Sequence, residues 1–211
     1  MKQKLLATVA LAGLIAAGAP ARADSFNFNI SGPGIFGHIE LTYGPSTDAT
    51  YPQAQVVTGI SGTFTDTNNG LNLVNAPITG LVALNPASPD VSNLLAPANF
   101  SKFFIASGSA FGDFSYDQLF WPTGSVPTAT DYQVHGGFLD IYGLLFTVDG
   151  DTVNLWSNGD SGSGVDYGVG VATAAQQLDY VSGGLEVPEP GSLALFGVGL
   201  LGLAWRRRAT A

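Results

Sequence analysis

Cysteine is absent from this chain of 211 residues, and basic residues are scarce. Without cysteine the protein forms no disulfide bond and has no thiolate to use as a nucleophile or metal ligand. Its seven Lys and Arg stand against sixteen Asp and Glu, for a formal net charge of −9. A negative surface repels phosphate groups, which excludes nucleic acid and anionic membrane surfaces as partners.

The basic residues are also unevenly placed. Six of the seven lie at or before Arg22 or at or after Arg206, which leaves Lys102 as the only basic residue between Asp24 and Glu186. Fifteen of the sixteen acidic residues lie in that central region, so its net charge is −14. Such a surface attracts cations and favours solubility outside the cell.

Strong helix formers such as Lys, Arg and Met are rare in the central region, whereas Thr, Val, Gly and aromatic residues are plentiful. Two early segments, Ser25–Ile30 and Ile35–Tyr43, alternate between apolar and polar residues, as half-buried strands do. The further segments expected as strands are Val56–Thr65, Leu71–Leu84, Phe103–Ile105, Phe114–Trp121, Phe138–Val148, Thr152–Trp156 and Tyr167–Ala172. Many are separated by Gly, Asn-Gly or Asp-Gly, and Val148–Thr152 reads as a tight hairpin. The pattern predicts an all-β body, an antiparallel β-sandwich with a jelly-roll-like arrangement.

Three segments interrupt this pattern. Asn85–Phe100 contains three prolines and is expected to be a long loop, and Pro122–Thr130 a shorter one. Ala172–Gln177 is the only segment of the body expected to form a helix. The body, residues 24–186, is predicted to be a single domain with a core of its own.

Residues 1–23 have the features of a secretory signal peptide, which is expected to form an N-terminal signal helix. Lys2 and Lys4 supply the positive start, and an apolar stretch of 13 residues follows from Leu5 to Ala17. Ala21 and Ala23 provide the small residues of an A-x-A cleavage site. The protein is therefore expected to be exported through the inner membrane.

The tail, residues 187–211, has three parts in a fixed order. Pro188, Glu189 and Pro190 come first, an apolar run from Leu193 to Trp205 follows, and Arg206, Arg207 and Arg208 end it. The run spans roughly 20–24 Å as a helix, short of the ~30 Å hydrocarbon core of a bilayer. Moving three arginines across a membrane would cost roughly 7–10 kcal/mol. The run is therefore expected to be a transmembrane helix that holds the chain in the membrane with its arginines inside, and only transiently.

This arrangement resembles the PEP-CTERM sorting signal of Gram-negative bacteria. The resemblance covers about a tenth of the chain, from Val187 to Arg208. It implies recognition by an exosortase, a membrane-embedded cysteine transpeptidase that cuts near Pro188–Pro190 and passes the body to the cell surface. Several body segments, such as Val57–Asp66 and Tyr116–Pro122, also resemble a domain that PEP-CTERM proteins often carry. They contain no reactive residues and support only the fold.

Two short motifs resemble catalytic or cofactor-binding sequences. Gly159–Gly162 spells the GDSG of chymotrypsin-like proteases, whose triad would need His38 or His135 as the base. His38 lies in Gly-His-Ile-Glu, unlike that family's histidine segment, the disulfides that the family usually carries are missing, and the residues around GDSG are typical of a hairpin loop. Gly32–Gly37 fits G-x-G-x-x-G, yet a strand pattern follows it where a dinucleotide site needs a helix. Both motifs are interpreted as turns.

Calcium is the metal that the composition favours. A zinc or copper site is not expected, because the two histidines lie far apart and cysteine is absent. Calcium binds oxygen ligands, and acidic residues gather in two neighbouring hairpin loops. Asp149, Asp151, Asp160 and Asp166 are the candidate ligands, although each also suits a turn. No other cofactor is expected.

The leading interpretation is a non-enzymatic exported protein of the cell surface or extracellular matrix, structural or associated with polysaccharide. The PEP-CTERM resemblance implies bacteria that make exopolysaccharide, the candidate partner besides exosortase. The alternatives are a secreted glycan-active hydrolase, which needs two carboxylates about 5–10 Å apart in a cleft, and a calcium-dependent or ice-binding adhesion module. Trp121, Trp156, Tyr132 and Tyr142 are the aromatic residues that could stack on sugar rings, although most are expected in the core.

Overall fold

The structure is a computed structural model and describes residues 24–84, 104–106, 114–129, 132, 134–173 and 178–185. The predicted signal helix (1–23), the loop at 85–100 and the tail (187–211) lie outside these residues. Of the predicted helix Ala172–Gln177, only Ala172 and Thr173 are described, and Ala172 ends a strand.

The described residues form strands and one short 3-10 helix. The elements are β1 (Asp24–Gly32), β2 (Ile35–Thr47), β3 (Gln55–Asp66), η2 (Asn68–Gly70), β4 (Leu73–Leu81), β5 (Phe104–Ala106), β6 (Phe114–Tyr116), β7 (Leu119–Phe120), β8 (Leu144–Val148), β9 (Asp151–Asp160), β10 (Val165–Ala172) and β11 (Leu178–Leu185). The prediction of an all-β body is confirmed.

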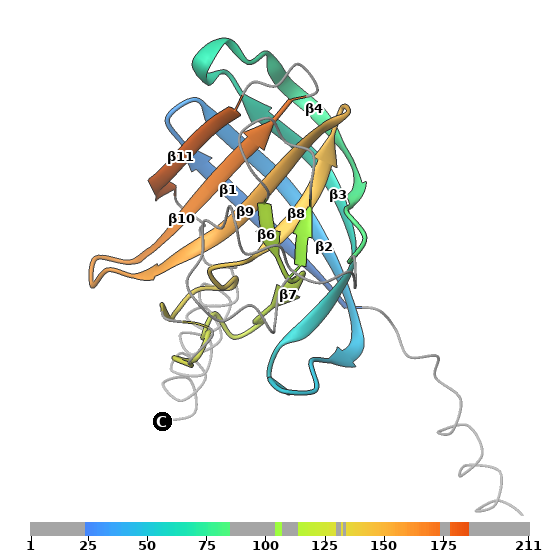
Figure 1. Cartoon of the computed structure of the whole chain (residues 1–211), viewed down its shortest axis with the longest axis vertical. Coiled ribbons are helices and arrows are strands. Elements are labelled where there is room, and N and C mark those ends of the chain that lie inside the picture. The colour runs from blue at the N-terminus through green and yellow to red at the C-terminus, as the bar shows by residue number, and fades with distance from the viewer. Residues whose placement is uncertain are drawn as a thin grey trace, which may run out of the picture.

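One antiparallel sheet contains most of these strands. Its order is β1-β2-β3-β4-β8-β9-β10-β11, while β7 pairs with the start of β3 and β5 pairs with β6 in a separate two-stranded ladder. The sheet curls like a half-barrel until β11 lies beside β1 (Figure 1). Only the step from β4 to β8 joins strands far apart in the sequence.

The two stacked sheets of the predicted sandwich are not confirmed. In this structure both sides of the core belong to the same curled sheet, because its first and last strands meet. A strand with one buried face shows the same alternation of apolar and polar residues in both arrangements. The buried face can pack against a second sheet or against the opposite side of the same curled sheet. The sequence pattern therefore could not distinguish these two arrangements.

The inside of the curled sheet is the main apolar core. It takes buried side chains from strands along the whole sheet, among them Phe28, Ile39, Phe64, Phe146 and Val169. The predicted alternation of β1 is confirmed, with Phe28 and Ile30 buried and the asparagines between and beside them exposed. On β2, Phe36 faces outward and is 55% exposed.

Strands β8, β9 and β10 are buried on both faces. On their outer side the rings of Phe114 and Trp156 lie against glycines of β10. A Cβ added to Gly168 would come within 2.3 Å of the Trp156 ring, and one added to Gly170 within 2.8 Å of Phe114. Glycine is therefore needed here to let the aromatic rings approach the backbone.

The hairpin predicted at Val148–Thr152 is confirmed. Val148 pairs with Asp151, and both turn residues have positive φ, 47° at Asp149 and 89° at Gly150. This is the two-residue turn that an Asp-Gly sequence favours. The strand β11 was not predicted. It pairs with β10 across a register shift between Tyr167 and Gly168.

Two glycines next to β8 allow a test of the close packing in this part of the sheet. Gly143 has a φ of +66°, and a Cβ there would lie 2.0 Å from the carbonyl oxygen of Leu155. Gly150 has a φ of +89° and nothing within 4 Å of the same position. Gly150→Ala should therefore lower the free energy of unfolding by only about 1 kcal/mol, the cost of the left-handed backbone.

Gly143→Ala adds a clash with backbone to the same strain and should cost about 3 kcal/mol or more. Urea unfolding of the two variants measures the difference. Equal losses of stability in both variants would contradict the close approach of Gly143 to β9.

Candidate functional site

A pair of aspartates, Asp117 and Asp140, is almost completely buried at one end of the sheet. Asp117 lies between β6 and β7, and Asp140 lies in the loop before β8. They are 3% and 1% exposed, respectively. Neither was among the predicted site residues. The signal that could have indicated them is an isolated acid inside an otherwise apolar segment, as in the sequences YDQLFWP and FLDIYGLLF.

Hydrogen bonds hold both carboxyl groups in place. Asp117 Oδ1 accepts from the Leu119 N–H at 3.0 Å, and the Tyr132 hydroxyl donates to Asp117 Oδ2 at 2.9 Å. Asp140 Oδ1 accepts from the N–H groups of Tyr142 and Gly143, each at 2.9 Å. Such side-chain-to-backbone bonds form turns instead of strands. They explain why the strand predicted at Phe114–Trp121 is interrupted and why the one predicted at Phe138–Val148 begins only at Leu144.

The two carboxyl groups adjoin each other in the core, and each affects the pKa of the other. Burial, the charge of Asp140 and a hydrogen bond to it raise the pKa of Asp117 well above its usual range. Burial raises the pKa of Asp140 to about 6, against the lowering effect of the hydrogen bonds that it accepts. Asp140 Oδ2 is buried and has no other hydrogen-bond partner among the described residues. Because two adjoining buried carboxyl groups do not both ionise readily, the pair binds a proton more tightly than isolated aspartates do.

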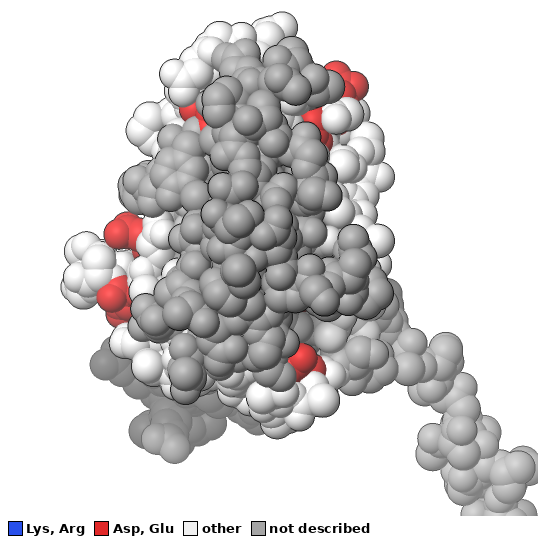
Figure 2. Space-filling view, in the orientation of Figure 1, with Lys and Arg blue, Asp and Glu red and all other residues white. Residues whose placement is uncertain are grey.

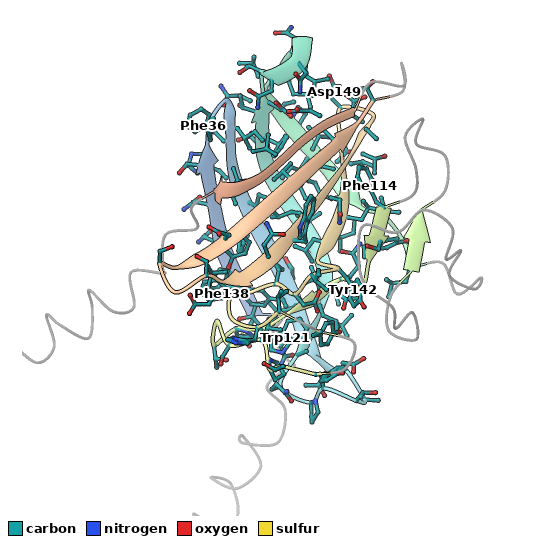
Figure 3. All side chains as sticks on the ribbon, turned by 60° about the vertical axis from the view of Figure 1, so that its left-hand side comes forward. Phe36, Phe114, Trp121, Phe138, Tyr142 and Asp149 are labelled. Atoms are coloured by element: carbon teal, nitrogen blue, oxygen red, sulfur yellow. The ribbon has the colours of Figure 1, made fainter. Side chains whose placement is uncertain are left out.

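Aromatic side chains separate the pair from solvent. The Tyr132 ring meets Trp121 edge-on, with centroids 5.5 Å apart, and Tyr142 at 5.6 Å. Together with Ala54, Leu119 and Val126 they form a second apolar cluster. Figure 3 shows Trp121 and Tyr142 at the end of the curled sheet opposite Asp149. The arrangement can hold a proton. Among the described residues there is no opening through which a substrate could reach the carboxyl groups.

The four predicted calcium ligands do not form one site. Asp149 and Asp151 lie at the β8–β9 turn, whereas Asp160 and Asp166 lie at the β9–β10 loop. Nine residue steps of β9 separate Asp151 from Asp160, which is about 30 Å. Consecutive turns of an antiparallel sheet lie at opposite ends of the strand between them, so neighbouring loops in the sequence are distant in space. Asp160 instead caps its own loop, with Oδ1 accepting from the Gly162 N–H at 2.7 Å.

The described part of the chain contains no group of three or more His, Asp or Glu side chains that could hold a metal ion. The GDSG motif begins at the end of β9, where Gly159 is buried, and continues with Ser161 and Gly162 into the exposed β9–β10 loop. Ser161 Oγ lies 2.9 Å from Ser163 Oγ and donates to the Gly164 carbonyl at 3.2 Å. The His135 carbonyl accepts from the Asp160 N–H nearby, but no described hydrogen bond joins Ser161 to that histidine.

The aromatic candidates for sugar stacking are all buried. Trp121, Tyr132 and Tyr142 are fully buried, and Trp156 is 5% exposed. Trp156 also donates its ring N–H to Asn158 Oδ1 at 2.9 Å. The expectation that most of these residues belong to the core is confirmed.

The comparison with known families concerns the tail. Residues 186–208 match the PEP-CTERM protein-sorting motif. The tail of this chain therefore carries a PEP-CTERM sorting signal, as the sequence predicted. No curated protein and no solved structure matches it.

The PEP-CTERM motif implies secretion across the membrane and cleavage by an exosortase. The sorting residues Pro188, Glu189, Pro190, Arg206, Arg207 and Arg208 lie outside the described residues, as do Ala21 and Ala23 of the signal cleavage site. Within the described residues, no helix has the length and apolar character needed to span a membrane. The roles of these residues therefore remain predictions.

The buried pair predicts how the stability of this PEP-CTERM protein depends on pH. Because the pKa of Asp140 is raised to about 6, the folded protein binds more protons than the unfolded chain between about pH 4 and pH 6. The free energy of unfolding should therefore fall as the pH rises through that window. Asp140 accounts for about 2–3 kcal/mol of this loss, at 1.36 kcal/mol per pKa unit.

Asp140→Asn keeps an acceptor for Tyr142 and Gly143 but cannot ionise. Its free energy of unfolding should fall less between pH 4 and pH 8 than that of the wild type, as measured by urea unfolding across the range. Asp149→Asn, at an exposed turn, is the control and should keep the wild-type dependence. An Asp140→Asn variant with an unchanged pH dependence would show that Asp140 does not take up a proton in this range.

Proposed function

We propose that this protein is an exported, non-enzymatic component of the cell surface or extracellular matrix, structural or associated with exopolysaccharide. The observation that carries the proposal is the PEP-CTERM motif at residues 186–208, because it implies delivery of the body out of the cell. An acidic body without cysteine suits that location, since it needs no disulfide chemistry and stays soluble.

Processing at both ends would release the body. A signal peptidase would cut after Ala23, and an exosortase would cut near Pro188–Pro190. Between these steps the apolar run from Leu193 to Trp205 would lie in the inner membrane, with Arg206–Arg208 on its inner side. The membrane is a transient partner in this account, and exosortase is the processing partner.

The enclosed aspartates support a non-enzymatic role over a glycan-active hydrolase. A glycosidase needs two carboxyl groups on either side of a sugar in an open cleft. Asp117 and Asp140 have raised pKa values, as a catalytic acid often has, but they contact each other and lie behind Trp121 and Tyr132. Their hydrogen bonds to turn N–H groups give them a structural role instead.

The outer face of β1, β2 and β3 supports association with a neutral polar polymer. Asn27 and Asn29 of β1 and His38 of β2 are exposed there, and Asn29 Oδ1 lies 2.8 Å from His38 Nδ1. Ser61 and Thr63 continue the same face on β3, and the exposed Glu40 and Phe36 of β2 also lie on it. No lysine or arginine occurs among the described residues, and Figure 2 shows acidic residues scattered on the visible face. Amide and hydroxyl groups can exchange hydrogen bonds with sugar hydroxyls.

Replacing Pro188-Glu189-Pro190 with three alanines tests the proposal. In cells with the exosortase, the variant should still be exported but should stay in the inner membrane at nearly full length, because the cleavage site is lost. The wild-type body should be found shortened in the extracellular matrix and should be released when the polysaccharide is digested. Immunoblotting of cell fractions measures both.

Ser192→Ala, immediately after the motif, serves as a control and should be processed normally. Release of a shortened triple-alanine variant would contradict exosortase sorting. A wild-type body that is free in the medium, with or without polysaccharide digestion, would leave sorting intact but contradict the matrix association.

A further inference from the structure

A second pair of buried aspartates lies at the other end of β3. The first residues of β3 pair with β7, next to Asp117, whereas Asp66 is its last residue. Asp66 meets Asp179 of β11, and the two are 0% and 1% exposed. About eleven residue steps of β3 separate the two ends, so the two aspartate pairs lie more than about 30 Å apart along the strand.

The surroundings of this pair are rich in oxygen and amide groups. Asp66 Oδ1 accepts from the Asn68 N–H at 2.9 Å, and the Asn69 side-chain amide donates to Asp179 Oδ1. Asp66 Oδ2 is buried without a hydrogen-bond donor among the described residues, and the Asp66 carboxyl group adjoins that of Asp179. Asn69 itself is exposed, so solvent reaches the edge of the pair.

Two adjoining carboxylates need a positive charge to neutralise them. The described residues hold no lysine or arginine, and Lys102 is the only basic residue of the body. Burial, with the carboxyl group of Asp179 beside it, disfavours the charged form of Asp66. A cation that enters from the exposed edge at Asn69 could supply the missing positive charge.

We propose that Asp66 and Asp179, with Asn69, form a calcium-binding site at this end of the sheet. Calcium prefers carboxylate and amide oxygens and tolerates irregular geometry, with water completing its six to eight ligands. Rotating the side-chain amide of Asn69 by half a turn would direct its carbonyl oxygen, instead of its NH₂ group, toward the Asp179 carboxyl group. The Asp117–Asp140 pair differs because aromatic rings enclose it and three of its four oxygens already have donors, which leaves room for a proton alone.

This site is independent of the proposed function and does not use the predicted ligands at Asp149, Asp151, Asp160 and Asp166. With only two carboxylates, the expected dissociation constant is about 10⁻⁴–10⁻³ M, the range of extracellular calcium modules. Magnesium should bind more weakly, because it requires regular octahedral geometry and gives up its water reluctantly.

Calorimetric titration of the full chain, freed of metal and kept in mild detergent, tests the site with calcium chloride. The wild type should bind one calcium ion in the millimolar range or tighter at about pH 8. Asp66→Asn and Asp179→Asn should each weaken binding by about tenfold or more, since each removes a charged ligand. The double variant Asp149→Asn, Asp151→Asn is the matched control and should bind like the wild type.

Lowering the pH to about 5.5 should also weaken binding, because a proton then occupies Asp66. If Asp66→Asn does not fold, the Asp179→Asn variant and the pH dependence decide. The proposal is overturned if the wild type binds no calcium at 10 mM, or if Asp66→Asn or Asp179→Asn binds as tightly as the wild type. It is equally overturned if the control variant is the one that loses binding.

Discussion

A buried carboxylate in this protein has almost no cationic side chain with which to pair. One lysine serves the whole region from Asp24 to Glu186, and four aspartates of that region are nearly inaccessible to solvent. Burying an ionised carboxylate without a partner costs several kcal/mol. The structure meets this constraint by bringing the aspartates together in two pairs and by directing backbone N–H groups at them. Raised pKa values at Asp66, Asp117 and Asp140 are the direct consequence.

The same constraint shapes the end of the curled sheet. The turns at Asp117 and Asp140 interrupt two strands and bring residues 117–143 across the end of the core. Phe120 then reaches the main core and contacts Phe26 and Tyr43, with ring centroids 4.8 and 5.2 Å away. Gln118 replaces missing backbone pairing, because its side-chain amide donates to the Val82 and Leu145 carbonyls and accepts from the Leu145 N–H. Polar side chains thus complete the hydrogen bonding where the strands stop.

Local features of the sequence predicted local structure well. The alternation in Ser25–Ile30 and the Asp-Gly turn after Val148 depend only on neighbouring residues, and both are confirmed. The curl of the sheet depends on β11 meeting β1, a contact between the two ends of the body that no local pattern contains. The calcium prediction grouped Asp149 with Asp160 by closeness in sequence, although the strand between them holds them apart. The buried pairs escaped prediction for the opposite reason, since Asp66 and Asp179 are 113 residues apart and meet only in the fold.

The tail and the body thus determine different properties of the protein, its delivery and its stability. The PEP-CTERM motif determines where the chain is delivered, and the body must then stay folded outside the cell without disulfide bonds. Its stability there depends on how its buried carboxyl groups are neutralised, and the raised pKa values of the enclosed pair give that role to a bound proton.

Infrared spectroscopy tests this claim most directly, because a protonated carboxyl group has a carbonyl band distinct from that of a carboxylate. At about pH 5.5, above the ordinary pKa of aspartate, exposed aspartates are mostly ionised. The account predicts a protonated-carboxyl band in the wild type at this pH, because the pKa values of the buried pair are raised, and a weaker band in Asp117→Asn. A wild-type spectrum without that band, or a band of equal strength in Asp117→Asn, would contradict it.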